Sequence, residues 1–107
     1  DRPTAIFAAN NLLAIGALML MRERGIRVPE DIALVCFDDL EIASMIYPFL
    51  TVCAQPAYMM GSIAAEILLQ RLSKGGPNGP QRVILKPELI VRLSCGYSLV
   101  RKPPGEG

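Results

Sequence analysis

Short apolar runs alternate with segments of helical periodicity along the chain. Residues 5–9 and 32–37 are uninterrupted apolar runs, which are typical of strands buried on both faces of a sheet. Between them, residues 12–24 have helical periodicity, and Gly25 follows where a left-handed C-terminal cap is favoured. A strand, a helix and a strand joined by short turns predict a βαβ unit with parallel strands.

The second half of the chain continues this alternation. Its pattern predicts a third strand and a long amphipathic helix, at residues 51–54 and 57–73. Two weaker strand candidates, residues 83–85 and 89–91, flank Pro87. The connections are residues 40–46, a short helix or irregular segment, and residues 74–80, a loop rich in Gly and Pro. We therefore expect an α/β fold built on a parallel sheet.

The helix at residues 12–24 is apolar around nearly its whole circumference. Leu13 and Leu20 share one side, whereas Ile15 and Met19 lie on another. A helix that covers one face of a sheet needs only one apolar stripe. The remaining apolar residues therefore need a second partner to cover them. That partner is either another helix of this chain or a second subunit. We favour the subunit, because so short a chain offers few helices.

Composition narrows the classes of function. The 107 residues carry 11 Lys and Arg against 10 Asp and Glu, and this balance does not favour a nucleic-acid-binding face. The absence of histidine excludes Ser–His and Cys–His catalysis. Three cysteines without CxxC spacing favour reduced thiols in a cytoplasmic protein. Asn10 and Asn11 interrupt the most apolar stretch, so we expect no membrane span.

Polar residues follow the predicted parallel strands. Asn10 comes after the first strand and Asp38 after the second. Neighbouring parallel strands lie about 4.8 Å apart and end at the same edge, so both side chains can reach one small molecule. An amide and a carboxylate together suit vicinal hydroxyls, as in a sugar or a nucleoside. Alternatively, each residue only caps the following turn or helix. Gln55 follows the third strand. Its side chain either joins this edge or forms hydrogen bonds with backbone groups of the loop.

A catalytic alternative rests on the consecutive acids Asp38 and Asp39. Two acids at a strand end are typical of Mg²⁺ sites for phosphoryl transfer, but such sites need acidic, hydroxyl and lysine partners at other strand ends. The sequence offers amides there instead, and Asp39 is more typical of a turn or cap. No glycine-rich phosphate loop leads into a helix. We expect no catalytic residue, no metal and no cofactor, and hence no enzyme.

Four segments form an ordered series: AIFAANN at residues 5–11, RVPEDIALVCFDD at 27–39, PFLTV at 48–52 and RLSC at 92–95. This series resembles the LacI/GalR family of transcription regulators over roughly residues 3–96. The resemblance implies part of an effector-binding domain with a three-layer, periplasmic-binding-protein-like fold. In that family two α/β subdomains flank a ligand cleft, and dimers bind DNA through an N-terminal helix-turn-helix.

The resemblance also implies residue roles. The family positions that match Asn10 and Asp38 typically contact the ligand, and Gln55 falls at a crossover between the subdomains. The region through which family members dimerise matches four residues of this chain: Ile15, Met19, Met45 and Ile46. These roles imply a homodimer that senses a sugar or another polyhydroxylated effector.

The resemblance divides the chain into parts. Residues 1–96 correspond to a partial effector-binding and dimerisation domain, in which residues 1–55 belong mainly to the C-terminal subdomain and 56–92 mainly to the N-terminal one. Residues 97–107 are expected to be a flexible tail. The helix-turn-helix lies outside these parts, so we do not expect the chain to bind DNA by itself. A periplasmic sugar-binding protein of a transport system is the alternative with the same fold, but reduced cysteines and a doubly apolar helix favour the regulator.

The chain departs from the family pattern at two positions near the predicted site. Asn11 stands where the family has the Asp of an Asn-Asp pair, which removes a carboxylate from a helix N-terminus. Cys36 stands where the family usually has Gly, which adds bulk inside a strand. We expect the first change to be tolerated.

Overall fold

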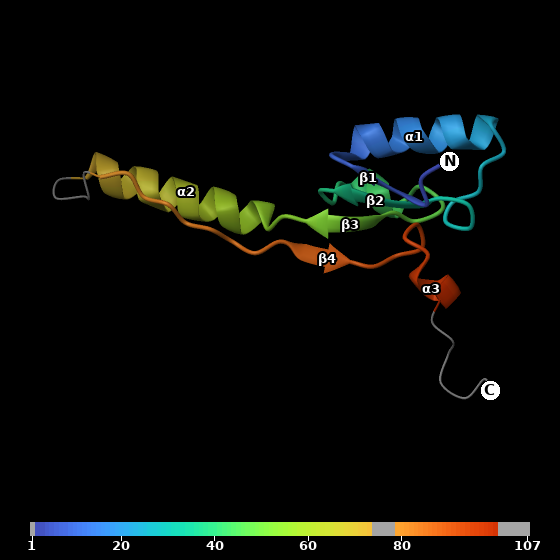
Figure 1. The fold of residues 1–107 in the computed structure, drawn as a ribbon. Coiled ribbons are helices and arrows are strands. Elements are labelled where there is room, and N and C mark those ends of the chain that lie inside the picture. Colours follow the sequence, from blue (N-terminus) through green and yellow to red (C-terminus); the bar gives the residue numbers. More distant parts are fainter. Residues whose placement is uncertain (1, 74–78, 101–107) are drawn as a thin grey trace. The chain divides into compact units, whose positions relative to one another are not determined.

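The computed structural model describes residues 2–73 and 79–100 (Figure 1). Its elements in chain order are β1 (Ala5–Ala8), α1 (Asn11–Glu23), β2 (Ala33–Phe37), the 3-10 helix η1 (Glu41–Ser44), β3 (Thr51–Ala54), α2 (Ala57–Leu72), β4 (Glu88–Ile90) and α3 (Tyr97–Val100). The predicted βαβ unit, third strand and second long helix are confirmed to within one or two residues at each end. None of the described helices combines the length and apolar character needed to cross a membrane.

The four strands form one sheet in the order β1-β2-β3-β4. The β1–β2 pair is parallel and places Ala8 opposite Cys36, and the β2–β3 pair is parallel and places Phe37 opposite Cys53. The β4 arrow points against β3 in Figure 1. The α/β class and the parallel arrangement of the first three strands are therefore confirmed.

The chain divides into two compact units. The first comprises the described residues up to Ala54 and from Leu89 onward, and the second runs from Gln55 to Glu88. Residues 89–92, which we grouped with the second subdomain from the sequence, lie in the first unit. Assigning the units to two subdomains of a larger domain stays a prediction.

The core of the first unit lies between α1 and the sheet. The helix buries Ala14, Leu18 and Met21 at spacings of four and three residues, and the sheet contributes buried residues such as Leu34. This spacing is that of one helical face, so α1 covers the sheet with a single stripe. Its opposite side is also apolar and stays open: Leu12, Leu13, Met19 and Leu20 are each more than half exposed. No described residue of the first unit covers this second face.

The second unit contains α2 and the segment that follows it. None of the residues of α2 is buried, and Leu68, Leu69 and Leu72 are each more than half exposed. The predicted strand at residues 83–85 is wrong, since the described backbone forms no strand there. Val83 and Leu85 instead line a hollow of about 240 Å³ against Met60 and Ile67 of α2. These residues therefore border α2 across a hollow and do not pair with a strand.

Two predicted segments lie partly outside the described residues. Of the loop at residues 74–80, residues 74–78 are not described, and of the tail at residues 97–107, residues 101–107 are not described. The start of that tail, Tyr97–Val100, forms the single helical turn α3.

Side chains tie the segment after β4 to the parallel strands. The buried Ser94 hydroxyl accepts a hydrogen bond from the Thr51 backbone N–H at 2.8 Å and donates to the Leu34 carbonyl at 2.5 Å. The Leu34 N–H in turn donates to the Ser94 carbonyl at 2.8 Å. The Arg92 N–H donates to the Thr51 hydroxyl at 2.9 Å. This segment therefore adds further hydrogen bonds at the start of the β2–β3 ladder.

Cys36 stands at the interior strand position where the resemblance implies Gly. Its side chain is fully buried. Burial raises the pKa of the Cys36 thiol, and the carboxylate of Asp39 raises it further. Because the thiolate is the reactive form, we expect iodoacetamide to modify Cys36 at least about tenfold more slowly in the folded chain than after unfolding in urea. Peptide mass spectrometry measures both rates, and equal rates would contradict this burial.

Candidate functional site

The carboxyl ends of β1 and β2 bring the two principal predicted residues to one edge of the sheet. The register pairs Ala8 with Cys36, so Asn10 and Asp38 each stand two residues beyond a paired position. The strands run in the same direction and are neighbours. The geometric basis of the predicted site, two polar side chains following parallel neighbouring strands, is therefore confirmed.

Asn10 is the N-cap of α1. Its backbone is extended, with φ −156°, and its Oδ1 accepts a hydrogen bond from the Leu13 N–H at 2.9 Å. Asn10 therefore caps α1, and this leaves its amide Nδ2 group without a hydrogen bond to any described residue. Because the side chain is exposed, this nitrogen can donate to a ligand.

Asp38 adopts a backbone conformation that is uncommon for its type. Its φ is +80°, and within residues 2–73 and 79–100 no other residue except glycine has a positive φ. The Asp38 N–H donates to the Cys53 carbonyl at 2.7 Å, and its Oδ1 accepts from the Asp39 N–H at 3.0 Å. The second carboxylate oxygen makes no hydrogen bond with a described residue. A negatively charged acceptor is thus held on this edge.

Asn11 is the first residue of α1, directly after the Asn10 cap, and only 1% of its surface is exposed. Its Nδ2 donates to the Asp38 carbonyl at 2.8 Å and to the Phe37 carbonyl at 3.3 Å. Its Oδ1 is buried without a partner. The one feature of the sequence that singled out this residue is that Asn stands where the resemblance implies Asp.

Asp39 forms an ion pair that the sequence did not reveal. The Arg92 guanidinium contacts both carboxylate oxygens, at 2.9 and 3.1 Å, and one of its nitrogens also donates to the Leu50 carbonyl. The two side chains are 26% and 20% exposed, and the bidentate geometry is the strong form of this pair. Asp39 therefore anchors the chain after Asp38 to the segment after β4.

Gln55 follows β3 directly and begins the second unit. Its backbone carbonyl accepts a hydrogen bond from the Ala57 N–H at 2.8 Å, and its side chain is half-buried without a hydrogen bond to a described residue. Its participation in a site with Asn10 and Asp38 stays a prediction. No three His, Cys, Asp or Glu side chains of the described part gather closely enough to hold a metal ion.

The sequence of the chain matches a known family over nearly its full length. Residues 1–95 match the model of the periplasmic binding protein-like domain. The chain belongs to this family. The ribose operon repressor of Haemophilus influenzae is 37% identical over 100 residues, which cover 92% of this chain and 29% of the repressor. The chain therefore spans less than a third of that relative's length.

Solved structures of regulators share this fold. The regulator CelR in complex with cellobiose is 40% identical, with a TM-score of 0.80 over 85% of this chain and 28% of CelR. A LacI family regulator from Arthrobacter sp. FB24 in complex with lactose is 34% identical, with a TM-score of 0.79 over 87% of this chain and 35% of the regulator. The resemblance to LacI-type regulators is confirmed, and these relatives are regulators rather than enzymes or transport proteins.

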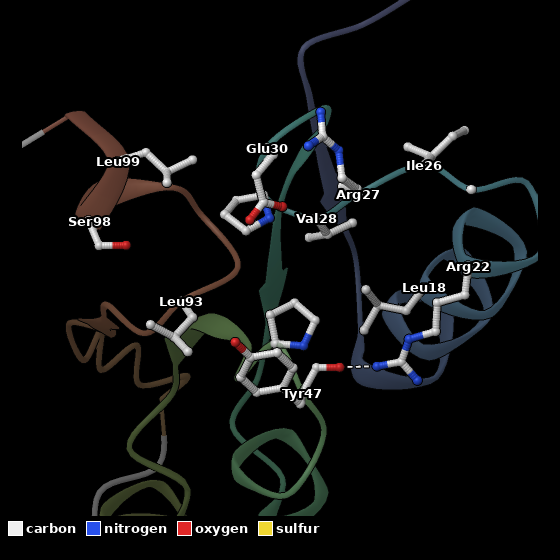
Figure 2. A pocket seen from close by; sticks show the side chains of 13 residues that line it. Leu18, Arg22, Ile26, Arg27, Val28, Glu30, Tyr47, Leu93, Ser98 and Leu99 are labelled. Atoms are coloured by element: carbon white, nitrogen blue, oxygen red, sulfur yellow. Dashed lines mark hydrogen bonds between the residues drawn. The ribbon is translucent and has the colours of Figure 1, made fainter.

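A cavity in the first unit of this periplasmic-binding-protein-like chain lies at the other edge of the sheet. It measures about 570 Å³, and Figure 2 shows Tyr47, Glu30 and Leu99 on its walls. The residues Val28–Glu30 and Tyr47 precede β2 and β3, which places the cavity at the amino ends of these strands. Arg22 donates to the Tyr47 carbonyl there. Ligands of open parallel sheets bind at the carboxyl ends, so this cavity is not the candidate site.

The predicted dimer residues lie in the first unit and differ in exposure. Met19 and Met45 are 59% and 73% exposed, whereas Ile15 and Ile46 are half-buried. Ile46 packs against the core. The roles of these four residues in a dimer stay predictions.

Proposed function

We propose that the chain is the effector-sensing and dimerisation part of a LacI-type transcription regulator. The observation that carries this proposal is the placement of Asn10 and Asp38 after neighbouring parallel strands. In the complete protein, DNA would be bound by a helix-turn-helix outside this chain, in the cytoplasm. Effector binding would alter DNA affinity through linkage, because the effector favours one arrangement of the two subdomains.

The effector that suits this edge is a sugar or another polyhydroxylated molecule. The free Asp38 oxygen can accept from one hydroxyl, and the Asn10 Nδ2 can donate to its neighbour. Hydrogen bonds to a carboxylate are about twice as strong as those between neutral groups. The names of the relatives agree with this class, since one is a ribose operon repressor and two structures contain cellobiose and lactose.

A second copy of the chain is the partner that we propose for the open face of α1. Leu12, Met19 and Leu20 form this face, and Met45 is also exposed. Apolar patches of this kind mark protein interfaces. We infer a homodimer, with contacts that include Ile15 and Ile46.

Asp38→Gly in the complete protein tests the site most sharply. Glycine adopts φ +80° without strain, so the change removes the carboxylate and leaves the turn accessible. The probes are cellobiose, lactose and D-ribose. For the sugar that binds the unmodified protein, we expect the affinity to fall roughly 10–150-fold, equivalent to about 1.5–3 kcal/mol. Isothermal titration calorimetry measures this loss.

Asp31→Asn provides the control for this substitution. Asp31 lies at the amino edge of the sheet, where the Arg27 hydrogen bond lowers the pKa of its carboxyl. This variant should bind the sugar as the unmodified protein does. Unchanged sugar affinity in Asp38→Gly would contradict the proposed site.

A further inference from the structure

Asn11 reaches from the start of α1 to the turn that carries Asp38. Its amide nitrogen lies 2.8 Å from the Asp38 carbonyl and 3.3 Å from the Phe37 carbonyl. We propose that Asn11 is a positioning residue, which holds the Asp38 carboxylate at the effector edge by donating to both carbonyls. The inference rests on the proposed function, because it assigns Asn11 to the site that contains Asp38.

The Asp38 turn needs such support. A positive φ is unfavourable for a residue with a side chain, relative to ordinary backbone. Three hydrogen bonds oppose relaxation: the Asp38 N–H to Cys53, the Asp39 N–H to the Asp38 carboxylate, and the Asn11 amide to the Asp38 carbonyl. Of these three, only the Asn11 bond attaches the turn to α1. Loss of this bond would let φ relax and swing the carboxylate away from the edge.

The bond requires an amide at this position. Both neighbours of the side chain are carbonyl oxygens, and only the NH₂ group of asparagine can donate to them. An ionised aspartate, the residue that the resemblance gives the family here, would place a negative acceptor against two further acceptors. This chain therefore has a support for Asp38 that the family pattern does not provide.

Asn11 acts through Asp38 and does not touch the effector. The residue is 1% exposed, and its unpartnered Oδ1 is buried. An unsatisfied buried acceptor is unfavourable. Retaining the amide despite this cost is consistent with a role for the Nδ2 side of the group.

Asn11→Asp in the complete protein tests the proposal. At about pH 7.5 the ionised carboxylate that this substitution introduces cannot donate, and we expect the Asp39 amide hydrogen to exchange at least about tenfold faster relative to the unmodified protein. At about pH 5 part of the introduced carboxyl is protonated, because the two carbonyls raise its pKa, and the protonated form can donate. The difference in exchange rate should then shrink.

Asn11→Ala and the unmodified protein are the controls. Alanine has no donor, so its exchange should be faster at both pH values. The charged groups near the turn are Asp38, Asp39 and Arg92, and measuring the unmodified protein at each pH corrects for their titration. Exchange in Asn11→Asp that equals the unmodified rate at about pH 7.5, or that does not recover at about pH 5, would overturn the proposal.

Sugar affinity separates this inference from the proposed function. With cellobiose, lactose and D-ribose as probes, we expect Asn11→Asp to weaken binding at about pH 7.5 and to have no further effect in an Asp38→Gly background. An affinity loss for Asp38→Gly with none for Asn11→Asp would overturn only the role of Asn11. Faster Asp39 exchange in Asn11→Asp, with unchanged affinity in Asp38→Gly, would support the turn contact and reject the effector site.

Discussion

Ser94→Ala is expected to lower the free energy of unfolding of the chain by about 2–4 kcal/mol. The fully buried hydroxyl serves two backbone groups on different strands, the Thr51 N–H and the Leu34 carbonyl. Alanine would leave both contacts unmade, and each unsatisfied buried group costs about 1–3 kcal/mol. Urea unfolding monitored by circular dichroism measures the change.

Ser98→Ala is the matched control for this substitution. Ser98 is an exposed serine in the same segment, and we expect its replacement to change stability by less than about 0.5 kcal/mol. Equal stabilities of the Ser94 and Ser98 variants would mean that the hydroxyl does not join the strands.

Leu34→Ala is expected to cost about 2–5 kcal/mol. Leu34 is fully buried in β2, which lies between β1 and β3. Truncation removes buried apolar surface and leaves a cavity under α1, because a packed sheet collapses only partly around a missing side chain. The same urea titration measures this loss.

Leu68→Ala is the control for the core substitution. Leu68 lies on α2 and is more than half exposed, and alanine has the higher helix propensity. We expect a change of less than about 1 kcal/mol. A loss at Leu34 no larger than that at Leu68 would contradict the core described for the first unit.

Much of the first unit could be predicted because its signals are local. The apolar runs before Asn10 and Asp38 have the length and continuity of buried strands, and the intervening helix has a clear end at Gly25. Parallel pairing then follows from the connection, since a helical crossover leaves the second strand running in the same direction. For the same reason, the sequence could predict that Asn10 and Asp38 lie at one edge of the sheet.

The remaining features depend on contacts between distant residues. Arg92 pairs with Asp39 across 53 positions, and Ser94 bonds to Leu34 across 60. No periodicity encodes such pairs. The support of Asp38 by Asn11 depends on a positive φ that aspartate adopts only in context. Residues 83–85 have a strand-like composition, but they line a hollow beside α2 and do not pair with a strand. A pattern of apolar residues does not distinguish these two arrangements.

A crystal structure of the complete protein with its bound sugar, chosen from cellobiose, lactose and D-ribose, tests the central claim most directly. The account predicts sugar hydroxyls within about 3.2 Å of the Asp38 carboxylate and the Asn10 amide, at the carboxyl edge of β1 and β2. A sugar bound at the opposite edge, in the cavity beside Glu30 and Tyr47, would contradict it.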